Sequence, residues 1–467
     1  MVKYDKISLI TFGVNNRKVT IVTAAVIIIL VILDLLTTRQ ILYFDNTSEI
    51  VLFILTAIIG YGIGSFILLR FTHRVSTELR AKSPFVNTMH WIIMIIQFSL
   101  FGILLFILYN NFTNCYGYFS LCNGTRSSTI PVHAISSIAA SIILATLSFK
   151  FFSWYRLNYK NFIVLCYGLA AAALAIQIAG DAFDKLLLVQ VVEEKSPAGA
   201  IPQSSFIYKT FKKYHGEIEY KVVNPHTTTL YVVPTSKLDL YNQIIYLTSL
   251  VPHILTWLGT FMLLHYYYQR KFGRLNFTFW ITLGVPLILY LVGSGLIFSL
   301  PADIPYKYYF RLLFRAGTIG SSILFGLAFY ITTRDLNSVK VKDYLTIAAI
   351  GTTMIGISFS ASALQQTYGI AAHSLVLLSS YLFTVGLYSA AISVSHDTSL
   401  RKLVRKSTLG LLDNIGTAQM EQELEKRIMK LVVNNQEQME EQSGVSSSMT
   451  KGDIKDYMEQ VVQETKK

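Results

Sequence analysis

The side chains best suited to chemistry are charged residues that lie beside long apolar runs of the chain. Arg311 and Arg315 are four residues apart, so they share one face of a helix. Carboxylates stand at comparable positions beside other apolar runs, and we expect acids and bases to meet in one polar layer. That layer forms either ion pairs that hold helices together or a site for a polar ligand. Its members are Asp34, Asp181, Asp184, Asp303, Arg311 and Arg315.

Motifs of known enzyme classes are missing from the sequence. It contains no His-Glu-x-x-His, no Cys-x-x-Cys, no Walker loop, no Gly-x-Ser-x-Gly and no kinase or dinucleotide signature. Histidines occur in or beside the apolar runs at positions 90, 133, 253, 265 and 373, but their spacing does not favour haem or a metal. We therefore do not expect an enzyme, a bound metal or a cofactor.

The composition is that of a membrane protein. Of the 467 residues, 52% are hydrophobic and 14% are charged, and the apolar residues form blocks long enough to cross a bilayer. The expected fold class is an all-α polytopic membrane protein with about ten transmembrane helices. The blocks are 19–36, 50–69, 89–109, 134–151, 162–182, 241–265, 277–298, 309–332, 344–363 and 370–394. Close helix packing is predicted at Gly60, Gly62, Gly64, Gly293 and Gly295.

Lysine and arginine concentrate in alternate connecting segments, which predicts the orientation of the chain. The net charge is +13, but residues 395–467 carry 11 basic and 12 acidic side chains, so the excess belongs to the membrane part. Such an excess indicates topology and not binding to nucleic acid. It predicts that both termini are cytoplasmic, with residues 1–18 forming a cytoplasmic N-terminus.

The predicted topology places one cysteine pair and three glycosylation acceptors on the outer side. Cys115 and Cys122 share one short polar segment, where they form a disulfide or stay as two free thiols. Cys166 lies in an apolar run and is expected to be a small buried side chain. The glycosylation acceptors Asn46, Asn111 and Asn123 all lie outside on this topology.

The largest outer segment is residues 183–240, which separates the first five helices (19–182) from the second five (241–394). Its stretches GEIEYKVV and TTTLYVVP alternate in polarity and predict a β-hairpin, and SSFIYKTF is a candidate third strand. This extracytoplasmic β-containing insertion is either a cap that shields the helix ends or a cap that senses a ligand.

The last segment, residues 395–467, is predicted to be a cytoplasmic amphipathic helical tail. Its first turns carry basic side chains that suit contact with anionic lipid headgroups, and a later apolar stripe needs a partner surface. That partner is a second copy of the chain, another protein or the inner loops. The lipid contacts are Arg401, Lys402, Arg405 and Lys406, and the stripe is Met420, Leu424, Ile428 and Leu431.

The end of the chain is similar to one group of proteins. The stretches AAISVSHDTSLRKLVRKS, LLDNIGTAQMEQELEKRI and SSSMTKGDIKDYMEQVVQE resemble the C-terminal region of uncharacterised archaeal multi-pass membrane proteins. The resemblance is specific for the last span and the tail. It implies a location in the archaeal plasma membrane, and it transfers no activity to any residue.

The sequence supports three hypotheses on function. The first is a sensory or regulatory membrane protein that couples the outer cap to the cytoplasmic tail. The second is a transporter or channel for a small polar solute, with the outer charged layer as its entrance. The third is an accessory subunit of a membrane complex. The sequence identifies no ligand, oligomeric state or partner protein.

Overall fold

The computed structural model describes residues 17–38, 47–77, 80, 84–115, 129–157, 162–195, 206–214, 217–223, 228–272, 277–299, 307–333, 338–362 and 372–396. These residues form helices of 22 to 38 residues and three strands. The helices before the sheet are α2 (Arg17–Thr38), α3 (Thr47–Val75), α5 (Pro84–Cys115), α6 (Thr129–Leu157) and α7 (Phe162–Lys195). The helices after it are α8 (Thr235–Phe272), α9 (Phe277–Ser299), α10 (Lys307–Thr333), α11 (Val339–Ser362) and α12 (Ala372–His396).

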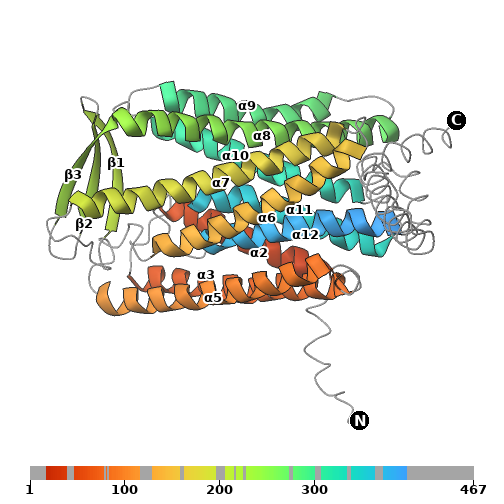
Figure 1. The fold of residues 1–467 in the computed structure, drawn as a ribbon, viewed down its shortest axis with the longest axis horizontal. Coiled ribbons are helices and arrows are strands. Elements are labelled where there is room, and N and C mark those ends of the chain that lie inside the picture. Colours follow the sequence, from red (N-terminus) through yellow and green to blue (C-terminus); the bar gives the residue numbers. More distant parts are fainter. Residues whose placement is uncertain are drawn as a thin grey trace, which may run out of the picture.

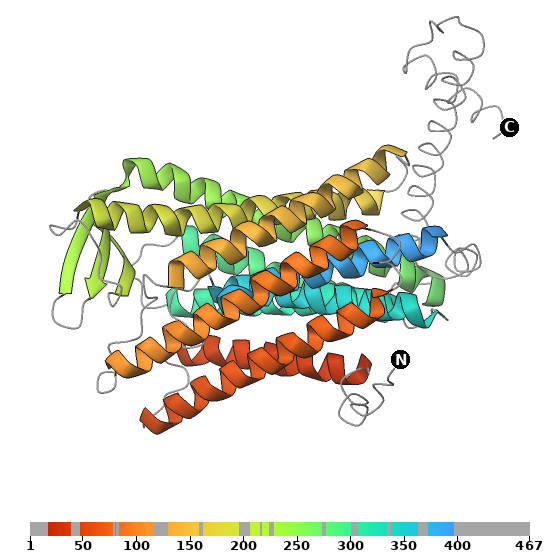
Figure 2. The same cartoon turned by 60° about the horizontal axis from the view of Figure 1, so that its bottom comes forward.

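The helices lie side by side in one elongated bundle (Figure 1). Helices α8, α9 and α10 occupy one side of the bundle, and α2, α3 and α5 occupy the other (Figures 1 and 2). Between them, α12 packs against α11 and α6, while α6 also packs against α7. The core of the bundle therefore lies around α11 and α12, which contact helices on both sides of it.

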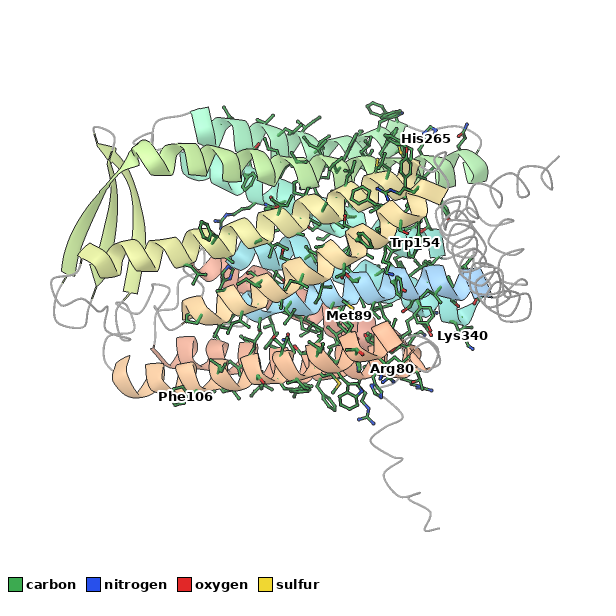
Figure 3. All side chains as sticks on the ribbon, viewed as in Figure 1. Arg80, Met89, Phe106, Trp154, His265 and Lys340 are labelled. Carbon is green, nitrogen blue, oxygen red and sulfur yellow. The ribbon has the colours of Figure 1, made fainter. Side chains whose placement is uncertain are left out.

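Seven helices of the described residues are long and apolar enough to cross a membrane. Their apolar windows are Leu55–Val75, Val86–Ile103, Pro131–Arg156, Phe162–Phe183, Phe279–Leu296, Leu313–Thr333 and Ser374–Val394. Large apolar side chains such as Ile63, Phe106 and Phe149 are exposed, as expected for surfaces that contact lipid. Phe106 lies on the outside of the bundle (Figure 3). The prediction of a multi-pass membrane protein is confirmed. The number of ten crossings stays a prediction.

Helix α12 is enclosed by the rest of the bundle along its whole apolar window. Every residue from Ser374 to Val394 is buried except Ser393, which is partly exposed. Glycines bring its neighbour α11 unusually close: a Cβ atom on Gly351 would lie 2.7 Å from Cα of Phe383, and one on Gly386 would lie 2.7 Å from the Tyr344 carbonyl oxygen. Even an alanine side chain at either position would force the two backbones apart, so α11 and α12 form a tightly packed pair.

The glycine predictions are confirmed at four positions and wrong at the fifth. A Cβ atom on Gly60 or Gly64 would lie 2.6 Å from Leu30 or Ile27 of α2, so these glycines let α3 approach α2. Gly62 contacts Phe101 of α5 in the same way, and Gly293 of α9 contacts the backbone of Phe314 in α10. By contrast, Gly295 has open space beside it, because the face of α9 that carries it is exposed.

A three-stranded antiparallel sheet lies at one end of the bundle (Figure 1). Its strands are β1 (Phe206–Tyr214), β2 (Glu217–Val223) and β3 (Thr228–Pro234), in the order β1-β2-β3. Helix α7 continues to Lys195 and α8 begins at Thr235, so both helices extend beyond the predicted spans into this segment, and its boundaries at the membrane stay a prediction. The stretch LLLVQVVEEK after Phe183 lacks glycine and proline, and nothing in it ends a helix at the membrane surface. The side of the membrane on which the sheet lies stays a prediction.

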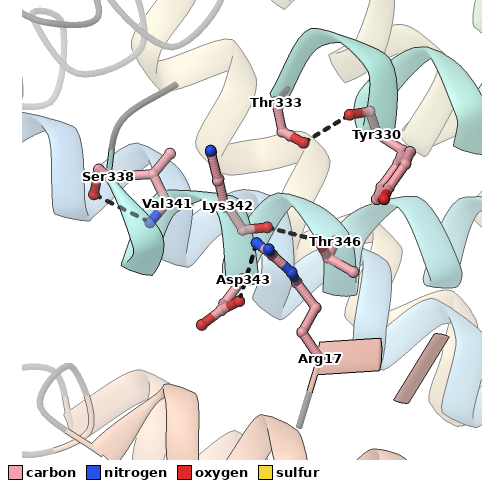
Figure 4. A network of polar contacts seen from close by, with 8 residues as sticks. All are labelled: Arg17, Tyr330, Thr333, Ser338, Val341, Lys342, Asp343 and Thr346. Carbon is pink, nitrogen blue, oxygen red and sulfur yellow. Dashed lines mark hydrogen bonds and ion pairs between the residues drawn. The ribbon is translucent and has the colours of Figure 1, made fainter. Parts of the chain in front are cut away.

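The opposite end of the bundle carries basic side chains, and we name it the basic end. Arg80 and Lys340 lie there, far from the sheet (Figure 3). In this region Arg17 of α2 and Asp343 of α11 form an ion pair, with 3.6 Å between the charged atoms (Figure 4). The Tyr344 hydroxyl donates to the Val75 carbonyl over 3.0 Å. These contacts join α2, α3 and α11 at the basic end.

Candidate functional site

The most conspicuous polar feature inside the bundle is a chain of two imidazoles and a phenol. Nδ1 of His73, near the end of α3, lies 2.8 Å from Nε2 of His90 on α5. The other ring nitrogen of His90, Nδ1, is hydrogen-bonded to the hydroxyl of Tyr381 on α12. We name these three residues the histidine layer, which joins three helices through hydrogen bonds between side chains.

Local sequence explains why the two histidines meet. His73 and His90 lie on either side of the short connection between α3 and α5, so the helical hairpin brings them to the same depth. Arg80 in that connection donates from Nη2 to the His73 carbonyl over 2.7 Å, which holds the connection against the last turns of α3. The ring centres of the two imidazoles are 4.8 Å apart, with 45° between the ring planes.

Burial changes steeply across the histidine layer. The His90 and Tyr381 side chains are 0% exposed, whereas His73 is only partly buried. His73 is therefore the member closest to the surface at the basic end, and Tyr381 is enclosed in the core. Polar side chains at such places are costly in a membrane protein, and they usually mark sites of function.

A second polar layer crosses the same three helices. The Tyr61 hydroxyl on α3 is hydrogen-bonded to the Ser374 hydroxyl on α12, and the Gln97 amide on α5 donates to Tyr61. We name these three residues the tyrosine layer; all are at least 97% buried. Gln97 and Ser374 are each seven residues from the histidine layer, which is about 10 Å along a helix. The two layers thus form a polar stripe between α3, α5 and α12.

Two other buried histidines have different partners. His133 of α6 lies with Nε2 2.8 Å from the Asp181 carboxylate of α7, and its side chain is 1% exposed. His253 of α8 lies 3.1 Å from the Ser321 hydroxyl of α10 and stacks on Tyr290 of α9, with ring centres 3.6 Å apart. Each of these two clusters joins neighbouring helices, and neither contains a residue of α12.

The ion pair at the basic end contains an acid in an unusual environment. Asp343 directly precedes the apolar part of α11, and burial raises the pKa of its carboxyl above the ordinary value. The cations of Arg17 and Arg74 oppose this rise. The loss of hydration on burial of the Asp343 carboxyl therefore outweighs the attraction of the two arginine cations.

The predicted outer polar layer is only partly visible. Asp181 and Arg315 have described side chains, and Asp181 is paired with a histidine, His133, that was not among the predicted members. The side chains of Asp34, Asp184 and Arg311 lie outside the described residues although their backbones are helical, and Asp303 lies outside them altogether. Convergence of the whole layer stays a prediction.

Several other predicted sites also fall outside the described residues. Cys166 is buried, as predicted. Asn111 and Cys115 belong to the last turns of α5, but the structure does not describe their side chains. The disulfide and the glycosylation sites therefore stay predictions. The residues wholly outside it are Asn46, Cys122, Asn123 and all of 397–467, including the predicted lipid contacts and the apolar stripe.

The geometry defines a class of protein but no prosthetic group. Among the residues that the structure describes, no three His, Cys, Asp or Glu side chains are grouped so as to hold a metal ion. The fold and the buried polar stripe define a multi-pass helical membrane protein with titratable groups in its core. The chain matches no known protein family, and comparisons with characterised proteins and with solved structures find nothing similar. The resemblance to archaeal membrane proteins stays a prediction.

Proposed function

We propose that the protein is a sensory or regulatory membrane protein in which α12 transmits the state of the buried polar stripe to the C-terminal tail. The observation that supports this function best is the position of α12. It is enclosed along its apolar window, it is hydrogen-bonded to α3 and α5, and the tail follows directly after His396.

Two kinds of contact around α12 favour a transmitting role. The close approaches at Gly351 and Gly386 involve backbone atoms, so α11 and α12 move together. In contrast, the histidine and tyrosine layers attach α3 and α5 to α12 through side-chain hydrogen bonds, which two alternative arrangements of the helices can form or break. A change in those bonds displaces α12 relative to α3 and α5, and the tail moves with it.

The proposal includes the finer topology. The chain crosses the plasma membrane ten times, with both termini in the cytoplasm and the sheet outside. Arg80 and Lys340 lie at the end of the bundle opposite the sheet (Figure 3), which supports a cytoplasmic basic end. In this arrangement the tail binds a second copy of the chain or another protein through its apolar stripe.

The test measures whether the core controls the tail. The three native cysteines are replaced, one cysteine is introduced by Met420→Cys, and its rate of thiol labelling is measured in the full chain in lipid nanodiscs. His90→Gln or Tyr381→Phe removes a buried hydrogen bond worth about 1 kcal/mol, which shifts a two-state equilibrium by about fivefold. We expect a change of that order in the labelling rate.

A matched control separates coupling from general damage. His253→Gln makes the same chemical change at another buried histidine, which contacts α9 and α10 but not α12. We expect it to leave the labelling rate at position 420 unchanged. Equal labelling rates in the parent, His90→Gln and Tyr381→Phe would contradict the proposed function.

Transport of a small polar solute is the second candidate, and one observation favours it. In the described part of the chain, Oε1 of Gln97 and the hydroxyls of Ser380 and Thr384 are buried without a hydrogen-bond partner. Such atoms usually have partners, which a polar solute is able to supply. Uptake of small polar solutes by vesicles containing the full chain, and its loss in Gln97→Leu, would favour transport. Vesicles no more permeable than empty ones would exclude it.

A further inference from the structure

The geometry of the histidine layer limits how many protons it holds. At 2.8 Å, His73 Nδ1 and His90 Nε2 share one hydrogen, because two N–H groups facing each other at this distance repel. With both rings neutral there are two arrangements. Either His90 donates to His73 and accepts from the Tyr381 hydroxyl, or His73 donates to His90 and His90 donates to Tyr381.

One added proton removes this freedom. Whether the added charge lies on His73 or on His90, Nδ1 of His90 must then carry a hydrogen and donate it to the Tyr381 oxygen. A second added proton would place hydrogens on both facing nitrogens, which the geometry excludes. The pair therefore takes up one proton from water and returns one to water, and its uptake fixes Tyr381 as a hydrogen-bond acceptor.

The surroundings decide from which side a proton arrives. His73 is the partly exposed member, close to the basic end, whereas His90 and Tyr381 are enclosed. The charged group of the described residues nearest the pair is Arg80, whose cation opposes a further positive charge. The other charged groups on the neighbouring helices are at the basic end, where the Asp343 carboxylate of α11 interacts with the cations of Arg17 and Arg74. The titratable group that α12 places beside the pair is Tyr381.

We propose that His73 and His90 form a site for a single proton, entered from the basic end, and that the proton is the stimulus which α12 reports to the tail. The identity of this stimulus rests on the proposed function. The site acts through Tyr381. In the neutral pair the Tyr381 hydroxyl either donates to His90 or accepts from it, and after protonation it only accepts from His90. The hydrogen-bond partner that Tyr381 donates to must then be sought elsewhere, and α12 shifts accordingly.

The first experiment counts protons. The full chain with ¹⁵N-labelled histidine is studied in lipid nanodiscs by nuclear magnetic resonance across the range in which imidazoles titrate, about pH 4 to about pH 9. We expect His73 and His90 to titrate together with one proton per chain, and either His73→Gln or His90→Gln to abolish that shared step. His253→Gln is the matched control and should leave it intact. Two independent protons, or no titration of either ring, would overturn the proposal.

The second experiment asks whether the proton is the stimulus. The labelling rate of Met420→Cys is measured over the same pH range in the parent and in Tyr381→Phe, whose ring keeps the packing of α12. We expect the labelling rate in the parent to change with pH in step with the shared titration of His73 and His90. In Tyr381→Phe the labelling rate should no longer depend on pH, although the two histidines still titrate. If the rate ignores pH in the parent but changes in Tyr381→Phe, the proton is not the stimulus and the proposed function stands. If the labelling rate depends neither on pH nor on the Tyr381→Phe substitution, the proton proposal and the proposed function both fail.

Discussion

The rigid attachment of α12 to α11 makes a quantitative prediction for one methyl group. In Gly386→Ala the new Cβ atom would lie 2.7 Å from the Tyr344 carbonyl oxygen and 2.9 Å from Cα of Ala348. Ordinary contact begins at 3.4 Å, so the two helices must separate by at least about 0.7 Å, and by more at the Ala348 backbone nitrogen, which lies closer still. Both opposing atoms are backbone atoms, which no change of rotamer is able to move.

The expected cost follows from overpacking of a well-filled interior. Added methyl groups in packed cores destabilise by about 1 to 3 kcal/mol, and we expect about 2 to 3 kcal/mol here because backbone must shift. Gly102→Ala is the matched control, since a Cβ atom on Gly102 of α5 meets nothing within 4 Å. The control should be as stable as the parent.

The assay uses the buried thiol of Cys166, which is 1% exposed. With Cys115 and Cys122 replaced by serine, a thiol-reactive dye reports unfolding when heating exposes Cys166. We expect Gly386→Ala to unfold at a distinctly lower temperature than the parent, and Gly102→Ala at the same temperature. Equal unfolding temperatures for Gly386→Ala and the parent would refute the close contact of α11 and α12.

Three further predictions concern stability. Burial raises the pKa of the Asp343 carboxyl, so this group stabilises the fold at low pH, and that stabilisation is lost as the pH rises above the ordinary pKa of aspartate. The unfolding temperature of the parent should therefore decline over this pH range, and that of Asp343→Asn should lack the decline. Tyr344→Phe removes the donor to the Val75 carbonyl and should cost about 1 to 2 kcal/mol in thermal unfolding. Asp181→Leu leaves His133 buried without its carboxylate and should cost about 2 to 3 kcal/mol, part of which the double variant with His133→Leu recovers.

The sequence predicted the helices well because apolar blocks report directly on local structure. Each of the ten predicted blocks lies mostly within one observed helix, and the order of elements agrees. Helices α7 and α8 extend beyond the predicted apolar blocks. A block marks where side chains prefer lipid, whereas a helix ends only where glycine, proline or a capping residue interrupts it.

The candidate site was largely missed, and the reason is distance along the chain. His90 and Tyr381 are 291 residues apart in the sequence, and Tyr61 and Ser374 are 313 residues apart. Such pairs become neighbours only through the packing of α12 against α3 and α5, and hydropathy does not reveal which helices pack together. The one local signal was the pair His73 and His90 on either side of a short basic connection, a spacing that places them at equal depth.

The central position of α12 also bears on how the protein is made. Among the described helices α12 is synthesised last, yet all of its apolar window except Ser393 is buried against helices made before it. The earlier helices must therefore leave a place open inside the membrane until translation reaches residue 394, and premature closure would exclude α12. Chains stopped before Ala372 should accumulate as unfinished bundles with an exposed polar stripe, which makes them substrates for membrane proteases.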